Sequence, residues 1–126
     1  MATARPDGRP HVVPFVFALV EEGASIRLYW VVDAKPKRSP ALQRLRNLER
    51  NPAVEIVVDG YEEDWARLWW VRASGNGRVV ETEAERAAAL QALGSKFPQY
   101  RMASLEGAVI AIDVASVTGW EAARES

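Results

Sequence analysis

Three cations stand within four residues in the first third of the chain, at Lys35, Lys37 and Arg38. They precede Ser39-Pro40, a pair typical of a helix start, because serine caps the first turn and proline lacks the N–H that would stay unpaired there. The first turn of a helix has free N–H groups and a partial positive charge, so it attracts anions. Together these features predict a site for a phosphate or carboxylate group.

Arg44 lies about one and a half turns further along the predicted helix, within reach of the same anion. The alternative is a solvent-exposed basic loop that pairs with the acidic turn Glu62-Glu63-Asp64, since charged residues are usually on the surface. From the spacing alone both interpretations stand. The adjacent helix start is the argument for a ligand.

Charge is segregated along the chain although the net charge is only −1. The segment from Lys35 to Arg50 holds six cations against Glu49 alone, and the segment from Glu55 to Asp64 holds five acids and no cation. Basic residues near aromatic ones are also found in single-strand nucleic acid binders. The acidic block and a pI near 5.9 would repel a phosphate backbone, so we expect a small anion and no nucleic acid partner.

Side chains for covalent or metal chemistry are few. Cysteine is absent and His11 is the single histidine, so thiolate chemistry is excluded and no metal site is predicted. His11 is either a general acid or, as we favour, a hydrogen-bonded structural residue. The run Gly75-Asn76-Gly77 lacks the third glycine and the strand-to-helix setting of a dinucleotide site, so we interpret it as a turn. No catalytic residue is assigned.

Tryptophan is abundant, with five in 126 residues and three of them, Trp65, Trp69 and Trp70, within six positions. On a strand Trp69 and Trp70 face opposite sides, so one of them needs a second apolar surface. That surface is either a second subunit or a planar ring bound to the protein. Core packing with dimerisation is the simpler interpretation and predicts a homodimer.

The elements that must position these residues follow from apolar periodicity and turn residues. Strands are expected where apolar residues alternate, and helices where they recur every three or four positions. In the first half of the chain we expect a short segment Ala2–Arg5, a turn at Pro6-Asp7-Gly8, an apolar run His11–Val20 and a strand Ser25–Asp33. A helix follows from Ser39-Pro40 to Asn51-Pro52, with Leu42, Leu45 and Leu48 inward, and then a strand Ala53–Asp59 and a long β segment Trp65–Glu81 that is bulged or broken at Gly75-Asn76-Gly77. The last part is expected to hold a helix from the capping box Thr82 and Glu85 to Leu93 with Gly94 at its end, an irregular stretch Phe97–Leu105, a strand Ala108–Val114, and one more at Val117–Trp120.

Six or seven strands and only two helices predict a mainly β, antiparallel barrel decorated by helices. At 126 residues the chain has the length of one domain, which we expect to span residues 1–126. It contains no run of about 18 apolar residues and no recognisable leader, so a cytoplasmic protein without a membrane partner is expected.

Several longer segments resemble a known family across nearly the whole chain. They are ATARPDGRPHVVPF, LYWVVDAKPKRSPALQRLRNLERNP, VVDGYEEDWARLWWVRASGNGRV, and FPQYR followed by GAVIAIDV and GW. Together they resemble the pyridoxamine 5'-phosphate oxidase-like flavin split-barrel superfamily and, more narrowly, its branch that depends on the deazaflavin coenzyme F420. The resemblance implies a homodimeric, antiparallel six-stranded split β-barrel (an FMN-binding split barrel), with a flavin or deazaflavin in each of two grooves between the subunits.

The resemblance also implies roles for particular residues. Basic residues where a strand passes into a helix hold the cofactor phosphate, the second-strand segment lies along the ring and offers it backbone groups, and a long strand walls the pocket. In this sequence the residues that would hold the phosphate are Lys35, Lys37, Arg38 and Arg44. The segment along the ring is Val13-Pro14-Phe15, and the pocket wall is Trp70 together with Trp69.

The chain departs from the family pattern at its beginning, since relatives usually carry an N-terminal helix and a fuller first strand. The function predicted is an F420-dependent oxidoreductase that transfers a hydride to a small conjugated organic acceptor, with the protein supplying orientation and charge. The alternatives are an FMN-dependent oxidoreductase at the same site and a non-catalytic carrier of a flavin or deazaflavin. The sequence does not identify the physiological acceptor.

Overall fold

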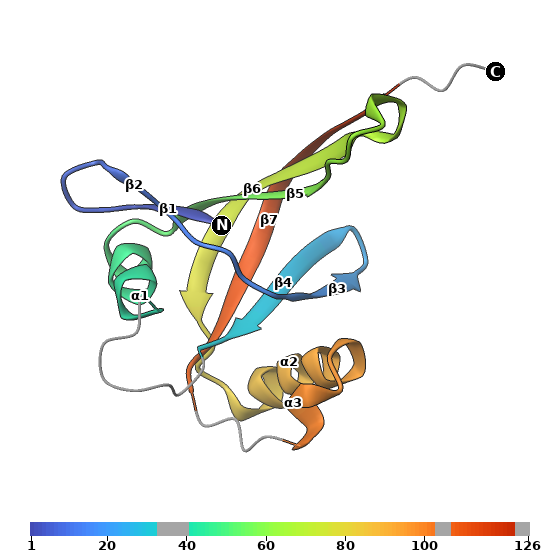
Figure 1. Ribbon diagram of the computed structural model, residues 1–126. Coiled ribbons are helices and arrows are strands. Elements are labelled where there is room, and N and C mark those ends of the chain that lie inside the picture. The colour runs from blue at the N-terminus through green and yellow to red at the C-terminus, as the bar shows by residue number, and fades with distance from the viewer. Residues whose placement is uncertain (33–40, 103–106, 123–126) are drawn as a thin grey trace.

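The computed structural model describes residues 1–32, 41–102 and 107–122 of the chain (Figure 1). Its seven strands are antiparallel to their neighbours and form one sheet in the order β2-β1-β5-β6-β7-β4-β3. The strands are β1 (Ala2–Ala4), β2 (Pro10–Val12), β3 (Ala18–Glu22), β4 (Ser25–Val31), β5 (Ala53–Gly60), β6 (Trp69–Val79) and β7 (Val109–Glu121). The helices are α1 (Ala41–Arg50), α2 (Glu83–Lys96), the four-residue α3 (Gln99–Met102) and the 3-10 helix η1 (Trp65–Arg67).

The mainly β fold with two longer helices agrees with the sequence-based prediction, but the sheet has seven strands where the family resemblance implied six, and it is not closed. The additional strand arises because the apolar run His11–Val20 is divided: β2 ends at Val12 and β3 begins at Ala18. Pro14 lies between them and lacks the N–H that a continuous strand would use. The two edges of the sheet, β2 and β3, are therefore joined by the short segment 13–17.

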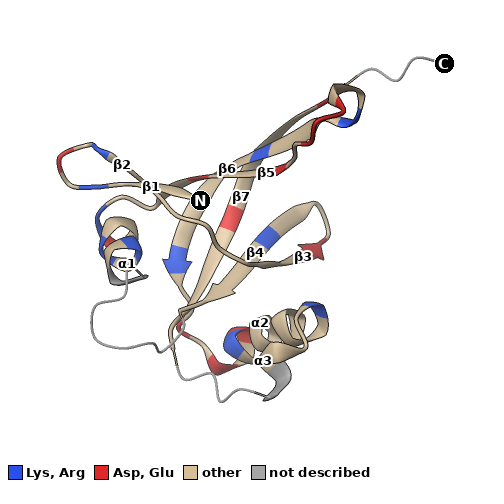
Figure 2. Cartoon of the chain, viewed as in Figure 1, with Lys and Arg blue, Asp and Glu red and all other residues tan. Residues whose placement is uncertain are grey.

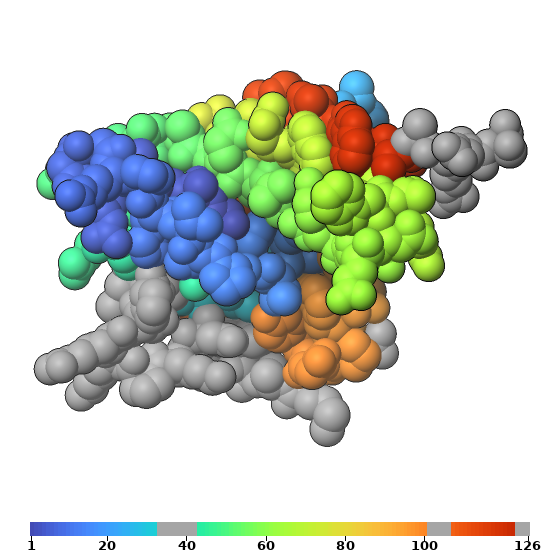
Figure 3. Space-filling view, turned by 45° about the horizontal axis from the view of Figure 1, so that its top comes forward, coloured from blue at the N-terminus to red at the C-terminus, as the bar shows by residue number. Residues whose placement is uncertain are grey.

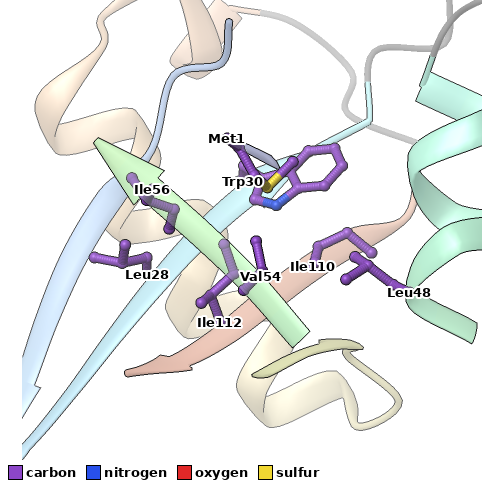
Figure 4. Packing of buried hydrophobic residues seen from close by; sticks show 8 residues of the cluster. All are labelled: Met1, Leu28, Trp30, Leu48, Val54, Ile56, Ile110 and Ile112. Atoms are coloured by element: carbon purple, nitrogen blue, oxygen red, sulfur yellow. The ribbon is translucent and has the colours of Figure 1, made fainter. Parts of the chain in front are cut away.

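Alternation along β4 separates two apolar cores, as its sequence predicted. Ile26, Leu28 and Trp30 face the inner side of the sheet, whereas Tyr29 and Val31 face the outer side. The buried residues of the inner core are Met1, Leu28, Trp30, Leu48, Val54, Ile56, Ile110 and Ile112 (Figure 4). Those of the outer core are Ala18, Tyr29, Val31, Ala89, Leu93, Val109 and Ala111.

Helix α1 packs on the inner core through the stripe that its sequence predicted. Leu48 is buried there and Leu45 packs against the same cluster. The helix approaches β6 closely because Gly77 has no side chain: a Cβ there would lie 2.8 Å from Cδ2 of Leu48. The expected start of this helix at Ser39-Pro40 lies outside the described residues.

Helix α2 covers the outer core, on the other face of the sheet. Thr82 caps its first turn, its side chain accepting a hydrogen bond from the backbone N–H of Glu85. The helix continues to Lys96, three residues past the predicted end at Leu93, because Gly94 is buried inside it and does not cap it. Part of the stretch predicted to be irregular, Phe97–Leu105, forms the short helix α3.

Strands β5, β6 and β7 extend together as a long arm of the sheet (Figure 1). The prediction of a turn at Gly75-Asn76-Gly77 is wrong, since all three residues lie within β6. The bulge is confirmed as a register shift next to Ser74, and β7 accommodates it with one extra residue. For that reason β7 runs unbroken where two strands were predicted. Trp65 lies in η1 and not in a strand.

Candidate functional site

Arg44 lies on α1 in an environment that is poor for an unpaired cation. Its guanidinium carbon is 5.0 Å from the ring centroid of Trp30, so the charge sits over an indole of the inner core. Its Nε atom is shielded from solvent and has no hydrogen-bond partner among the described residues. Burial lowers the pKa of Arg44, because a desolvated charge is disfavoured. A bound anion would supply the missing counter-charge.

Two further basic groups lie near Arg44. The amino group of Met1 donates to the carbonyl of Val13 at 2.9 Å, and the N–H of Val13 donates back to Met1 at 3.0 Å. Burial lowers the pKa of the Met1 amino group, and the charge of Arg44 lowers it further. The potential at this end of α1 is therefore positive, which favours an anionic ligand.

His11 is the third group of this neighbourhood. It pairs with Thr3 across β1 and β2, and its Nδ1 is shielded without a hydrogen-bond partner among the described residues. Burial lowers the pKa of His11, with smaller contributions from Arg5 and Arg44. A neutral imidazole is thus favoured at pH 7, which argues against a general acid. The expected structural hydrogen bond is not made by Nδ1.

A buried amide sets the orientation of α1. Asn47 is fully buried, its amide nitrogen donates to the Thr3 hydroxyl at 3.0 Å, and its amide oxygen accepts from Gln43 at 2.8 Å. These bonds fix how the helix lies on β1, and hence where Arg44 points. Sequence reasoning missed Asn47, because it lies outside the leucine stripe and is one of two polar residues between Leu45 and Leu48.

A hollow of about 590 Å³ lies between the β1–β2 turn and α1. Three arginines, Arg5, Arg46 and Arg50, contribute to its wall, and none has a side-chain hydrogen bond or ion pair with another described residue. The full lining is Arg5, Pro6, Asp7, Gln43, Arg46, Glu49 and Arg50. Since cations outnumber acids in this wall, the hollow suits an extended ligand with several negative groups. The excess of cations between Lys35 and Arg50 was the sequence signal for it.

The predicted ring segment Val13-Pro14-Phe15 reaches the same indole as Arg44. The Phe15 ring meets Trp30 edge-on at 6.4 Å and stacks on Phe17 at 5.2 Å. The backbone of Val13 is already paired with Met1 in both directions, so it has no group to offer a ring. Within this segment, the groups left to contact a ligand are the Pro14 carbonyl and Phe15. In Figure 3 the N-terminal residues, in blue, lie across one face of the molecule beside the yellow-green arm.

Trp70 lies apart from this group in a single chain. It sits on the arm opposite Trp120, and the guanidinium carbon of Arg72 is 5.3 Å from its ring centroid. An open hollow of about 410 Å³ adjoins these tryptophans. Its lining is Trp69, Trp70, Val71, Gly119, Trp120 and Glu121. Arg44, Val13 and Phe15 come together around Trp30, and Trp70 does not join them.

The predicted phosphate residues Lys35, Lys37 and Arg38 lie outside the described residues.

Sequence reasoning also missed a charged network between the sheet and α2 (Figure 2), where β7 carries an acid between arginines on β4 and β6. The Glu85 carboxylate accepts from Arg78 at 2.7 and 2.9 Å and from the Tyr29 hydroxyl at 2.8 Å. Arg27 and Arg78 both donate to Asp113, at 2.7 and 2.9 Å. The capping box was thus half right, because Thr82 caps the helix but Glu85 does not bond back to it.

The neighbouring arginines lower the pKa values of both acids. Hydrogen bonds from Arg78 and Tyr29 outweigh burial and lower the pKa of Glu85 to about 2. Arg78 and then Arg27 lower the pKa of Asp113 as well. Both acids are ionised at neutral pH and satisfied by two arginines, so the network serves to hold α2 on the sheet rather than to transfer protons.

Over residues 1–32, 41–102 and 107–122 there is no cluster of three or more histidines and acids that could hold a metal ion. No helix in the same ranges is long and apolar enough to cross a membrane.

The sequence of the chain matches the model of the pyridoxamine 5'-phosphate oxidase family over residues 1–121. The chain belongs to this family. That result confirms the broader part of the resemblance, to a fold that binds flavins, and does not extend to the F420 branch. No curated protein matches the chain.

Several solved structures share the fold. The conserved hypothetical protein Rv2991 from Mycobacterium tuberculosis superposes with a TM-score of 0.70 at 19% identity, covering 95% of this chain and 74% of that one. An FAD-binding protein from Mesorhizobium loti gives a TM-score of 0.62 at 18% identity, over 94% of this chain and 81% of that one. The heme storage protein HutZ from Vibrio cholerae gives 0.62 at 18% identity, over 95% and 82%. At these identities the similarity establishes the fold alone.

Proposed function

We propose that this protein is an oxidoreductase that binds the deazaflavin coenzyme F420 and passes a hydride to a small conjugated organic acceptor. The observation that carries the proposal is the set of cations along α1 that have no ion-pair partner among the described residues. Arg44 is desolvated without a counter-charge, and Arg46 and Arg50 line a separate hollow on the same helix. An isoalloxazine-type ligand with a long anionic side chain would satisfy both places.

The distribution of charge favours the deazaflavin over FMN. FMN ends in one phosphate, whereas F420 continues through a phosphodiester into a tail of several carboxylates. The half-buried Arg44 suits the phosphate, and the exposed Arg46 and Arg50 suit the tail. The hollow is open and about 590 Å³ in volume, which is room for a chain of carboxylates rather than a single group.

The residues of this chain then act by binding and orienting. Lys35, Lys37 and Arg38 are proposed to hold the phosphate together with Arg44, as the family resemblance implies. Pro14 and Phe15 would offer backbone contacts along the ring, while Trp30 beneath them closes the inner core to water. The reduced cofactor, when bound, supplies the hydride. We assign no proton donor, since burial and the nearby charges of Arg5 and Arg44 lower the pKa of His11.

A second subunit is part of the proposal. Trp70 faces outward beside Trp120, far along the arm from Arg44, so it can wall the cofactor groove only if it is contributed by a partner chain. We therefore propose a homodimer whose two grooves each combine α1 of one chain with the arm of the other.

Two alternatives rest on specific observations. FMN at the same site is supported by the family and by the similarity to an FAD-binding protein. A carrier without turnover is supported by the similarity to a heme storage protein and by the lack of a proton donor among the described site residues.

Cofactor binding tests the proposal directly. Purified protein is titrated separately with F420, with its tail-less and phosphate-less precursor, and with FMN, following tryptophan fluorescence. We expect F420 to bind tightest. Replacing Arg46 and Arg50 together by methionine should weaken F420 by about tenfold and leave FMN unchanged within about twofold. The Arg9→Met variant serves as the control, because Arg9 lies between β1 and β2 near the hollow but does not line it. FMN saturating at a lower concentration than F420 would favour the first alternative.

The phosphate residues are tested by a triple substitution. Changing Lys35, Lys37 and Arg38 to alanine removes charge-assisted contacts worth on the order of 1.5–3 kcal/mol each, without strict additivity. We expect both F420 and FMN to bind far more weakly while the circular dichroism spectrum is unchanged. Unaltered affinity would identify the stretch as a solvent-exposed loop. Steady-state turnover with a panel of acceptors then separates an enzyme from a carrier, because a carrier would bind without being reoxidised.

A further inference from the structure

The inner side of the sheet is closed at one end and open at the other. At the closed end Leu48 of α1 lies beside Ile110 in the inner core (Figure 4). At the other end lies an apolar cavity of about 180 Å³. It is lined by Phe17, Leu19, Ile26, Leu28, Ile56, Val58, Val71, Ala73, Val114 and Val117.

The wall of this cavity is apolar throughout, and its rim is exposed. Leu19 on β3 is 49% exposed and Val117 on β7 is 52% exposed, although both point to the inner side. Val58 and Val71, which face each other across β5 and β6, are 38% and 39% exposed. Filling a cavity of this kind with water is unfavourable, whereas filling it with hydrocarbon is favourable.

Lys96 contacts a residue of the cavity wall. The ammonium group of Lys96, at the end of α2, donates to the carbonyl of Phe17 at 2.7 Å and lies 4.4 Å from the centroid of the Phe17 ring. The same ring contributes to the cavity wall. Lys96 is exposed, forms no ion pair with a described residue, and has three N–H donors, so it can receive a further acceptor.

We propose that this cavity binds the alkyl chain of a medium-chain carboxylic acid, with the carboxylate at Lys96. A dry cavity of about 150 Å³ holds a benzene molecule, so the present volume suits a chain of roughly six to eight carbons with its last atoms at the exposed rim. The single cation selects an acid over an amine or an alcohol. The cavity shares no lining residue with the hollow beside α1, although Phe17 of its wall stacks on Phe15 of the proposed ring segment.

The proposal is tested by calorimetric titration of the full chain with octanoate, octanol and octylammonium. We expect saturable binding of octanoate, weaker binding of octanol and none of octylammonium. Lys96→Met keeps the packing of the stem on Phe17 and removes the charge, so it should weaken octanoate by about two- to fivefold and leave octanol unchanged. Val117→Phe fills the rim at an exposed strand position and should abolish binding of both.

Two results would overturn the proposal. One is the absence of saturable octanoate binding by the unaltered protein. The other is equal loss of octanoate and octanol in Lys96→Met, which would mean that the lysine acts by packing alone. Val58→Phe fills the same cavity from β5, so it provides a second test if Val117→Phe does not fold. If a second copy occupied the cavity, the unaltered protein would sediment as an oligomer that Val117→Phe dissociates, and octanoate would show no saturable binding, which is the first of these results.

Discussion

Arg44 shows how a single residue can be unfavourable for folding and favourable for binding. Its guanidinium is partly desolvated over Trp30, its Nε has no partner among the described residues, and the neighbouring Met1 amino group adds positive potential. Such an arrangement stabilises the protein only when an anion is present. Stability and ligand affinity should therefore move in opposite directions when this residue is changed.

Replacing Arg44 by methionine tests that relation. The variant keeps an apolar stem over the indole and removes the desolvated charge, so we expect the free energy of unfolding without ligand to rise by up to about 1 kcal/mol. Affinity for F420 or FMN should fall at least about tenfold. Urea denaturation and fluorescence titration measure the two quantities, and Arg9→Met should change neither. A variant less stable than the parent without ligand would show that Arg44 is already satisfied.

At the scale of the elements, the network of Arg27, Arg78, Glu85 and Asp113 holds α2 on the outer face of the sheet. The acids come from a helix and from the middle of β7, and the arginines come from β4 and β6, so four elements meet at one cluster. Because the pKa of each acid is lowered in the folded protein, protonation favours the unfolded state.

The pH dependence of stability follows from that sign. The pKa of Glu85 is about 2 in the folded chain against an ordinary 4.5, so its contribution is complete above pH 4.5 and is lost as the pH falls toward 2. Glu85→Gln should lower the free energy of unfolding by about 2 kcal/mol at pH 7 and flatten its decline below pH 4.5. Thermal melts across this pH range provide the measurement. Equal acid sensitivity in parent and variant would exclude Glu85 as the cause.

The shifted register of β6 and β7 depends on a glycine. A Cβ at Gly75 would overlap the carbonyl oxygen of Asp113, which is backbone and cannot rotate away. Gly75→Ala should destabilise the protein by about 2 kcal/mol or more. Gly119→Ala is the matched control on the same pair of strands, since its Cβ would lie 3.4 Å from the nearest atom, the carbonyl oxygen of Trp70. Chemical denaturation of both variants would show similar losses if the close approach were unimportant.

The elements themselves were largely predictable from local patterns. Alternation identified the two faces of β4, and the leucine spacing placed α1 on the core, because each pattern reflects one periodic backbone. Trp65 and Gly75-Asn76-Gly77 were misassigned because propensity and turn residues report only local preferences. A long strand paired on both sides, as β6 is, overrides them.

The candidate site was predictable only in part. Arg44 was found from its distance to a helix start, and Val13 to Phe15 from the family resemblance. Asn47 bonds to Thr3, 44 positions away, and Asp113 bonds to Arg27 and Arg78, 86 and 35 positions away, so no spacing rule could find these contacts.

At the scale of the whole molecule, the arm formed by β5, β6 and β7 presents apolar side chains on both of its faces. Trp70 and Trp120 lie opposite each other on the outer face, and Val58 and Val71 do so on the inner face. Trp120 is 47% exposed, which is a large apolar area to leave in water. The proposed homodimer would cover the outer face.

Sedimentation velocity of a Trp120→Ser variant tests this assembly. We expect the parent to sediment as a dimer and the variant to shift toward monomer by at least about tenfold in dissociation constant, since buried aromatic residues dominate interface energies. Val12→Ser, at an exposed position of β2 away from the arm, should leave the dimer intact. A parent that sediments as a monomer at every concentration would contradict the dimer and, with it, the role proposed for Trp70.

The joined edges of the sheet have a consequence for misassembly. An unprotected outer strand can template stacking with foreign chains, and amyloid grows in this way. Here Pro10 on β2 has no backbone N–H to donate, and Glu21 and Glu22 place negative charge at the end of β3. Lys96 donates a hydrogen bond to the Phe17 carbonyl just before β3. Growth by edge-on addition is thereby discouraged at both borders. Productive association is directed instead to broad surfaces, where side chains decide which partner is accepted.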